Sequence, residues 1–379
     1  MIKVQVIEEK SKLEEYTKSW EELYNSDAHD ISTSTGWTQA LLNTALSDGD
    51  KFILVVLSKF DKVVGIVPLI IRKGRSIFGT HTRHIFPISK LYHIHSDLLI
   101  DANNEELSDA FMSAVFTVAD KWDVFSFGNF LESNPIYHNI RNYLKMSRIN
   151  YRTFAEYPSF FIPFGNNFND YYENKSHKFR YEIERISKRL HSLGNVEYCK
   201  AEDVDSRSKA YEYLLHIEEN SWKHKQGTAI TSKDNQRYFF RELIHHEWDK
   251  RRLHLRFLLL NGEPIVYNLA LISKNKCYGL KGSFDERFRK LSPTTLLFIR
   301  VIEELIQHGI KEYDFSGEPY EWERKWTDKM RWHESLVVYN NTINAKMYLL
   351  YDTIFVKKFK FNTCNQGQLT YFNPRYIEP

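Results

Sequence analysis

A short basic segment in the second half of the chain combines two features that favour an anion. Ser292 directly precedes Pro293, a pair typical of a helix start, because a serine hydroxyl can cap free backbone N–H groups and proline fits the first helical position. The N–H groups at Thr294 and Thr295, with the positive end of the helix dipole, then attract a phosphate. Three cations lie just upstream: Arg287, Arg289 and Lys290. The segment therefore predicts a phosphate or pyrophosphate site.

The elements around this segment predict a strand, loop, helix and strand in succession. A strand is expected at residues 276–285, a helix with one apolar stripe at 294–308, and a second strand at 311–316. Such a unit normally forms a right-handed crossover between parallel strands. The alternative is an ordinary helix start beside a solvated loop. The basic segment follows the carboxyl end of the strand expected at 276–285. This position favours the ligand site, because ligands of open α/β sheets bind at the carboxyl ends of strands.

Two similar segments predict an internal duplication. Residues 52–71 and 253–272 each consist of a strand, a polar turn and a second strand, and the later turn is the strong hairpin signal Asn261-Gly262. The join falls near residues 157–174, where Pro, Gly and Asn interrupt any period, and a strongly basic amphipathic helix follows at 175–193. With a length of 379 residues, more than one core is expected. We expect domains at 1–160 and 161–340 and a tail at 341–379.

The order of hairpin, strand, loop, helix and strand resembles the core of the GNAT superfamily. Residues 253–326, from LHLRFLLLNGEPIV to GEPYEWERKW, resemble its CelD-like acetyltransferase family in particular. Supporting stretches are SHKFRYEIERISKRLHSLG at 176–194, ENSWK at 219–223, DKVVGIVPLI at 61–70 and SDLLID at 96–101. The resemblance implies an α/β (α+β) fold of two tandem GNAT-like domains, each a mixed, mostly antiparallel sheet flanked by helices, related to the Fem-type transferases.

The resemblance also implies an activity. It predicts an acyl-CoA-dependent N-acyltransferase that acetylates an amino group of a sugar or of an envelope or polysaccharide precursor. Acetyl-CoA or another acyl-CoA is the expected donor. Its pantetheine arm would lie between the strands at 276–285 and 311–316, with the pyrophosphate on residues 287–295. The usual glycine-rich phosphate loop is absent, and the family's Ser-Pro-Gly is Ser292-Pro293-Thr294 here.

Acyl transfer to an amine needs a proton acceptor, because a free ammonium is almost wholly protonated at pH 7. Asp285, at the end of a predicted strand, and Glu318 are candidates for the base or for positioning the acceptor. Capping and salt-bridge roles compete with this interpretation. Lys281 is a third catalytic candidate, through contact with donor or acceptor. Backbone N–H groups of the splayed strand are expected to stabilise the oxyanion.

Six further residues are candidates for binding substrate, and core or surface roles are the alternative for each. They are Trp222, Lys223, Asp314, Tyr320, Lys325 and Trp326. Trp222 and Lys223 lie in the region that lines the acceptor cleft of related folds. The first half lacks a Ser-Pro helix start directly after its hairpin. We therefore expect a degenerate half that shapes the acceptor cleft and binds no donor.

The overall composition excludes several classes of function. A net charge of +3 gives no global field for DNA. Cys199, Cys277 and Cys364 have no metal-ligand spacing, and the histidines form no HxxxH or HExxH motif, so no metal is predicted. The N-terminus lacks a signal-peptide pattern, and the longest apolar run, 63–71, is too short for a bilayer. These features predict a cytoplasmic protein without integral membrane contact and with a small-molecule or glycan-precursor acceptor.

Two alternative functions remain open. A Fem-like transferase would take an aminoacyl group from tRNA, and the basic helix at 175–189 would then contact RNA phosphates. A non-catalytic module would recognise a sugar or a protein. The tail contains an apolar helix candidate at 345–355 followed by Lys357, Lys358 and Lys360. It is expected to pack on the body, with subunit pairing or a membrane surface as lesser alternatives.

Overall fold

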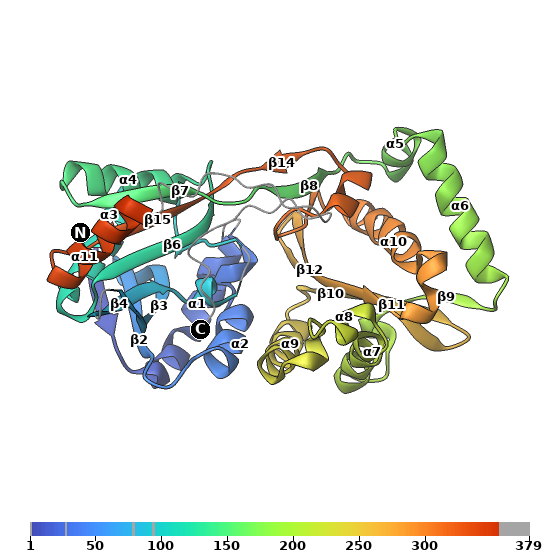
Figure 1. Cartoon of the computed structure of the whole chain (residues 1–379), viewed down its shortest axis with the longest axis horizontal. Helices are drawn as coiled ribbons and strands as arrows, with labels where there is room; N and C mark the ends of the chain where they lie inside the picture. The colour runs from blue at the N-terminus through green and yellow to red at the C-terminus, as the bar shows by residue number, and fades with distance from the viewer. Residues whose placement is uncertain (1, 27–28, 78–79, 93–94, 356–379) are drawn as a thin grey trace. The chain divides into compact units, whose positions relative to one another are not determined.

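The computed structural model describes residues 2–26, 29–77, 80–92 and 95–355. The chain divides into two compact units, coloured along the sequence in Figure 1. Of the described residues, the first unit contains those up to 42, those in 46–160 and 317–355, and the second contains 43–45 and 161–316. Within the described part of the chain, no helix has both the length and the apolar character needed to span a bilayer.

The first unit is built on one mixed sheet. Its strands, in spatial order, are β1 (Lys3–Ile7), β2 (Lys51–Lys59), β3 (Lys62–Ile77), β4 (Thr80–Pro87), β6 (Val124–Leu131), β15 (His333–Tyr339) and β7 (Tyr151–Ala155), and β5 (Leu99–Ile100) pairs with β3. β4 and β6 are parallel, and the other neighbours are antiparallel. Its longer helices are α1 (Thr17–Ser26), α2 (Thr35–Thr44), α3 (Glu105–Thr117), α4 (Pro135–Met146) and α11 (Ile343–Phe355).

The predicted hairpin at 52–71 is confirmed as β2 and β3. Both residues of its turn, Phe60 and Asp61, have positive φ (50° and 58°), the conformation that matches the twist of two-residue hairpins. Alternate β2 residues such as Val55 face a core that includes Phe111 of α3, and the residues between them are also buried. Helices therefore cover both faces of this sheet (Figure 1), which explains the continuous apolar run of the strand.

The second unit repeats this plan. Its strands are β9 (Val196–Lys200), β10 (Leu253–Leu260), β11 (Glu263–Ser273), β12 (Lys276–Phe284) and β13 (Glu312–Asp314), followed across the sheet by β8 (Ser159–Pro163), whose last three residues pair with β13. The helices are α5 (Phe168–Glu173), α6 (His177–His191), α7 (Arg207–Glu219), α8 (Trp222–Lys225), α9 (Asp234–Trp248) and α10 (Pro293–Gln307). α6 and α10 cover one face of the sheet, and α7 to α9 cover the other (Figure 1).

Three predicted elements of the second unit are confirmed. The 253–272 hairpin turns at Asn261 and Gly262, both with positive φ. β12 and β13 pair in parallel through α10, as the crossover requires. α6 begins after Ser176, whose side chain accepts from the backbone N of Phe179. The helix was expected to extend to residue 193, but it ends at His191, and Leu193 is 52% exposed.

The segment after residue 316 departs from the expected domain boundary. The second domain was expected to extend to 340, yet residues 317–339 belong to the first unit. β15 lies between β6 and β7, and its Leu336 and Val338 are buried in the core of that unit. β14 (Met330–Arg331) pairs with Ser159 and Phe160, also in the first unit. The short apolar run from Leu336 to Tyr339 is compatible with a strand, but it carries no information about which sheet the strand joins.

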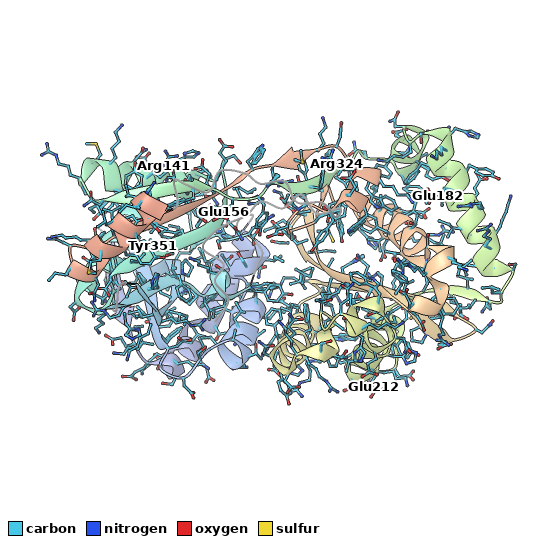
Figure 2. All side chains as sticks on the ribbon, in the orientation of Figure 1. Arg141, Glu156, Glu182, Glu212, Arg324 and Tyr351 are labelled. Carbon is cyan, nitrogen blue, oxygen red and sulfur yellow. The ribbon has the colours of Figure 1, made fainter. Side chains whose placement is uncertain are left out.

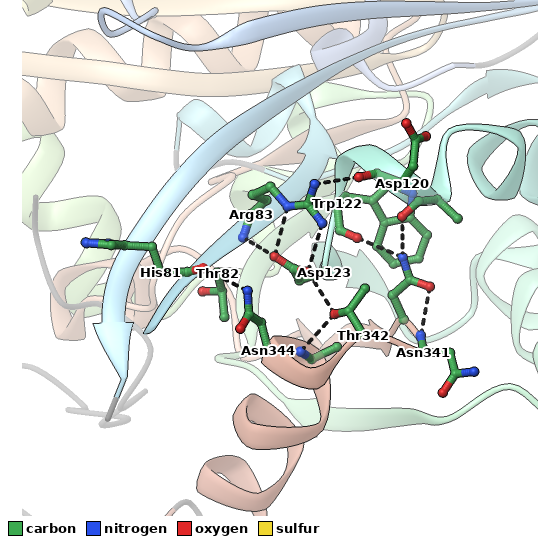
Figure 3. Close-up of polar contacts among 12 residues, drawn as sticks. His81, Thr82, Arg83, Asp120, Trp122, Asp123, Asn341, Thr342 and Asn344 are labelled. Carbon is green, nitrogen blue, oxygen red and sulfur yellow. Dashed lines mark hydrogen bonds and ion pairs between the residues drawn. The ribbon is translucent and has the colours of Figure 1, made fainter. Parts of the chain in front are cut away.

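The tail packs on the first unit as far as the structure describes it. Figure 3 shows the anchor, which is the buried carboxylate of Asp123. Arg83 donates to it from its backbone N, Nε and one terminal nitrogen (2.8, 3.1 and 3.0 Å), and Thr342 donates from its hydroxyl at 2.8 Å. Further along, Ala345 of α11 packs in a small cluster on β6 and β15. The expected basic cluster of Lys357, Lys358 and Lys360 lies outside the described residues.

A buried histidine pair joins β15 to the rest of the first unit. The rings of His333 and His95 stack with centroids 4.5 Å apart, and His333 Nε2 lies 2.9 Å from the hydroxyl of Ser159. Burial, reinforced by the neighbouring charge of His95, lowers the pKa of His333 well below its usual value. His333 therefore stays neutral in the folded state at pH values near 6.5, where it becomes protonated in the unfolded state.

This pair predicts acid destabilisation. As pH falls below about 6.5, the free energy of unfolding should decrease by about 1.4 kcal/mol per pH unit for each extra proton bound by the unfolded state. His333→Gln should remove this component from urea denaturation curves measured between pH 5 and 8. The exposed His138 on α4 offers a matched control, His138→Gln, which should retain it. Identical pH dependence in wild type and His333→Gln would contradict the assignment.

Candidate functional site

The site in the second unit begins where two parallel strands separate. β12 and β13 pair only from Lys276 to Tyr278, opposite Glu312 to Asp314, although β12 continues to Phe284. At Gly279, just beyond the last pair, a Cβ atom would lie 2.3 Å from the hydroxyl of Tyr313. Glycine is therefore required there. Beyond this point β12 has no paired neighbour on that side, and the resemblance places the gap between the strands at 276–285 and 311–316 here.

A bulge changes the direction of β12 within the same stretch. Lys281 lies opposite Leu269 and Gly279 lies opposite Ala270, so Leu280 has no partner in the ladder with β11. A bulge of this kind leaves one residue unpaired and re-aims its neighbours. The backbone N–H of Leu280 is thereby outside the β11 ladder at the point where the gap opens.

Two lysines and one glutamate gather beside the bulge. Lys223 of α8 donates a hydrogen bond from Nζ to the backbone oxygen of Gly282 (2.5 Å). Lys281 of β12 lies with Nζ 5.8 Å from the ring centroid of Phe240 on α9. Glu218 of α7 is fully buried and accepts from the hydroxyl of Tyr267 (2.6 Å) and the backbone N of Ile230 (2.7 Å). The side chains thus come from α7, α8, α9 and the sheet.

Both lysines of this cluster bind their protons more weakly than an ordinary lysine. Burial lowers the pKa of Lys223 to about 8, with a rise from Glu218 and a further lowering from Lys281. Burial also lowers the pKa of Lys281, against the same carboxylate. Because two ammonium groups face one glutamate, one proton is held weakly. Lys223 is consequently easier to deprotonate than an ordinary lysine, whose pKa is near 10.4.

The expected phosphate loop forms a short 3-10 helix, η7 (Glu286–Leu291), that is fixed by Asp285. Asp285 is fully buried, and its oxygens accept from the backbone N of Arg287 (2.9 Å), from Nε (2.9 Å) and from a terminal nitrogen (2.6 Å). Arg287 also bonds Glu263, and these hydrogen bonds, Asp285 first, raise its pKa further. Asp285, the candidate base, and Arg287, a candidate phosphate ligand, are thus bonded to each other within the protein.

The same carboxylates form a group that has the composition of a cation site. Ligand atoms of His216, Glu263 and Asp285 lie within 4.8 Å of one another. The guanidinium of Arg287 is already bonded to both carboxylates. It places one positive charge against the two carboxylates, and His216 Nε2 lies 3.4 Å from Glu263.

The start of α10 agrees with the sequence in part. Pro293 occupies the first turn as predicted, but Ser292 has φ 49° and ψ 51° and its side chain makes no capping bond. The prediction that its hydroxyl caps the helix is therefore wrong, because the left-handed conformation of the residue differs from the extended one that capping uses. Thr294 and Thr295 are half-buried. The first turn of α10 contains no acidic residue, whereas α3 of the first unit has Glu105 and Glu106 there.

The remaining predicted residues fall into both units. Arg289 is exposed and paired with Glu286, and Lys290 is exposed. Asp314 is buried and accepts from the backbone N of Ser316 (2.7 Å). Trp222 is 37% exposed and directly precedes Lys223. All of these predicted residues lie in the second unit.

The predicted residues after 316 lie in the first unit. Burial, followed by the charge of Glu156, raises the pKa of Glu318, and burial also raises that of Tyr320. Trp326 is buried, with Lys325 Nζ 5.9 Å from its ring centroid. The structure therefore does not gather Glu318 into the same unit as Asp285 and Lys281.

A separate cavity lies on the opposite face of the second sheet. Its volume is about 360 Å³, and Lys200, Arg300 and Glu304 are among the residues that line it, between α6 and α10. Within this cavity Glu304 is already bonded to Arg256 and Tyr198. The perturbed lysines are on the other face, with α7 to α9, and we place the candidate site there.

Part of the chain is similar to a known protein family. Residues 177–324 match the family model described as an acetyltransferase (GNAT) domain. The second unit has a GNAT-like fold. No curated protein sequence matches the chain. The match is to the GNAT domain in general, and it does not extend to the CelD-like family that the sequence resembles.

Solved structures are similar in fold to most of the chain. The crystal structure of FemX has a TM-score of 0.62 at 12% identity, over 92% of this chain and 99% of that one. The structure of L-PGS from Bacillus licheniformis has a TM-score of 0.52 at 11% identity, over 89% and 96%. A putative lysylphosphatidylglycerol synthetase domain from Agrobacterium fabrum gives 0.52 at 11%, over 90% and 96%. The predicted fold class, two tandem GNAT-like domains with mixed sheets and flanking helices, is confirmed.

Proposed function

We propose that the second GNAT-like unit transfers an acyl group from an acyl-CoA to an amine, and that an amino sugar or an envelope or polysaccharide precursor is the acceptor. The observation that carries the proposal is the lysine cluster beside the bulge of β12, where this strand leaves β13. A gap between two strands suits an extended pantetheine arm, which can bond to exposed strand backbone as an added strand. A CoA-dependent enzyme of this kind would act in the cytoplasm.

In the proposed reaction, Lys223 acts as the general base. The acceptor nitrogen attacks the thioester carbon and forms the new C–N bond, and neutral Lys223 removes the proton from that nitrogen. The C–S bond then breaks, and the leaving thiolate takes the proton back from the Lys223 ammonium. The backbone N–H of Leu280 and the ammonium of Lys281 stabilise the oxyanion formed in between. Asp285 is not used as the base, because its oxygens bond Arg287.

The diphosphate of the donor is assigned to the start of α10. Arg289 and Lys290 are exposed, and the first turn of this helix has no acid to repel an anion. Arg287 supports the loop through Asp285 and Glu263. In the first unit, Glu105 and Glu106 at the start of α3 would repel a diphosphate. We therefore propose one donor site per chain and no donor in the first unit.

The double variant Arg289→Ala/Lys290→Ala should weaken acetyl-CoA binding about 10-fold, because it removes two cations from the phosphate without disturbing Asp285. Isothermal titration calorimetry measures this change. The control is Arg300→Ala on α10, which removes an exposed arginine with the same i,i+3 type of ion pair as Arg289. Equal loss in both variants would show a general charge effect, and unchanged affinity in the double variant would reject the phosphate assignment.

A second candidate function has a specific observation in its favour. α6 exposes basic side chains that include Lys188 and Arg189. Glu182, labelled in Figure 2, is one of the acids on the same helix. An aminoacyl-tRNA donor would contact such a face through its phosphates, and its affinity would fall steeply with salt. Thermal unfolding with acetyl-CoA, CoA and aminoacyl-tRNA separates the functions, because a ligand bound only by the folded chain raises the Tm. A response to tRNA alone would favour this candidate, and no response to any of the three would favour a non-catalytic module.

A further inference from the structure

The first unit contains a small polar cavity that the proposed transfer reaction does not use. It lies among η2 (Ile31–Thr33), α2, β3, η3 (Ile88–Leu91) and β5, and Ser32, Thr38 and Ser89 line it. Each of these side chains is at least 97% buried, and their hydroxyl oxygens have no hydrogen-bond partner among the described residues. Buried hydroxyls normally find partners, so three of them around one cavity indicate a bound species.

A carboxylate lines the same cavity. Asp97 accepts from the side-chain nitrogen of Asn134 (3.1 Å) and from the backbone N of Asp30 (3.4 Å). The pKa of Asp97 is raised, mainly by burial and further by the charge of Asp30, against a lowering by the charge of His29. His95 is 3.6 Å from the carboxylate of Asp30, and it is therefore placed to neutralise Asp30 rather than Asp97. Asp97 thus forms no ion pair of its own within the described part of the chain.

The backbone around the cavity is consistent with an oxygen-rich lining. β3 pairs with β5 at Gly65 and Ile66 and with β4 from Leu69 onward. Val67 and Pro68 lie between these two pairings and line the cavity. Since proline has no N–H, this stretch of β3 presents fewer donors than acceptors. A species that accepts coordination from oxygen atoms is favoured over an anion.

We propose that this cavity binds one small monovalent cation, an alkali-metal ion or ammonium, with Asp97 as its counter-ion and the hydroxyls of Ser32, Thr38 and Ser89 as ligands. The cavity volume of about 10 Å³ admits one particle of the size of a water molecule. Water would satisfy the hydroxyls, but only a cation would also offset the charged form of Asp97, which burial disfavours. Calcium takes six to eight oxygen ligands and magnesium retains several waters, and neither fits this space.

The expected consequence is a stability that depends on the cation. The Tm of the full chain should be about 3 °C higher in 100 mM NaCl, KCl or NH4Cl than in choline chloride of the same ionic strength, because choline is too large to enter. The three salts distinguish the sources of the cation. The largest shift in sodium or potassium identifies a metal ion, and the largest shift in ammonium identifies an ammonium group.

Thr38→Val removes one ligand with little change in shape and should abolish this difference while the chain still unfolds cooperatively in choline chloride. The control is Ser108→Ala on α3, which removes a buried, unbonded hydroxyl of the same unit outside the cavity. Ser108→Ala should retain the full shift. As a second readout, crystals grown with thallium(I) should show an anomalous peak beside Asp97.

Two results would overturn the proposal. Equal Tm values in all four salts would mean that the cavity holds water only. A cation-dependent shift that persists in Thr38→Val, with no anomalous peak in the cavity, would place the ion elsewhere. Both results are independent of acyl transfer, so the proposal can fail while the proposed function stands.

Discussion

Lys223→Met is expected to lower kcat/KM for acyl transfer at least 100-fold, because it removes the proposed proton acceptor while keeping the length of the buried aliphatic chain. The substitution loses the hydrogen bond to the backbone oxygen of Gly282, which destabilises the fold. It also removes a buried charge, which offsets that loss. The folded state should therefore persist. The Tm of the variant, measured with the activity, separates a lost base from a lost fold.

The pH profile distinguishes a base from a merely structural lysine. Burial lowers the pKa of Lys223 to about 8, and the reactive form is the neutral amine. The activity of the wild type should therefore rise with pH and level off above about 8. The activity of Lys223→Met should be low and should no longer rise with pH in this range. A profile of the variant that keeps this rise would assign the titration to another group.

Lys225 provides the matched control for this experiment. It lies two residues further along α8 and is exposed, so Lys225→Met removes a lysine from the same helix without touching the cluster. Its kcat/KM should remain within about twofold of wild type. Comparable activity in Lys223→Met and Lys225→Met would exclude the proposed mechanism, whichever donor the chain uses.

The fold was predictable where the local pattern was sufficient. The hairpin at 253–272 and the helix start at Pro293 follow from the chemistry of single turns, and both occur as expected. The place of β15 did not follow, because strand pairing between residues far apart depends on sheet assembly. A domain boundary at 340 was the natural expectation from chain order alone.

The candidate site was predictable as a region and less so in its chemistry. Lys223 and Lys281 were both singled out, but Lys223 was expected to bind substrate, since nothing in a sequence shows that an ammonium is buried. Glu218 was missed for the same reason. Asp285 was expected to act as a base, and its neighbour Arg287 instead occupies its oxygens. A weak signal existed, because Asp two residues before Arg at a strand end is also a capping pattern.

The second large effect is expected at Glu304, on the opposite face of the second sheet. Its carboxylate accepts two hydrogen bonds from Arg256 (both 2.9 Å) and one from the hydroxyl of Tyr198 (2.6 Å). His254 Nε2 is 3.5 Å away and Lys200 Nζ is 3.3 Å away. Burial alone would raise the pKa of Glu304, but the bonds from His254, Arg256 and Tyr198 lower it far below the usual value. The carboxylate therefore remains charged inside the fold.

Glu304→Ala should lower the free energy of unfolding by about 3–5 kcal/mol, because it leaves the buried guanidinium of Arg256 with Glu202 alone, a half-exposed partner. Urea denaturation measures the change. Glu303→Ala is the control: it removes the adjacent glutamate, whose pair with Arg300 is at the surface, and should cost less than about 1 kcal/mol.

Replacing both buried partners tests the origin of this cost. If the loss in Glu304→Ala comes from an unpaired buried charge, Arg256→Met/Glu304→Leu should recover most of the stability, because it removes the charge along with its partner. If the loss comes from packing around α10, the double variant should be no more stable than Glu304→Ala. The lowered pKa of Glu304 also predicts how this loss depends on pH. The stabilisation from Glu304 is complete above about pH 4.5 and is lost as pH falls toward the folded-state pKa. The difference in free energy of unfolding between wild type and Glu304→Ala should therefore become smaller in acid.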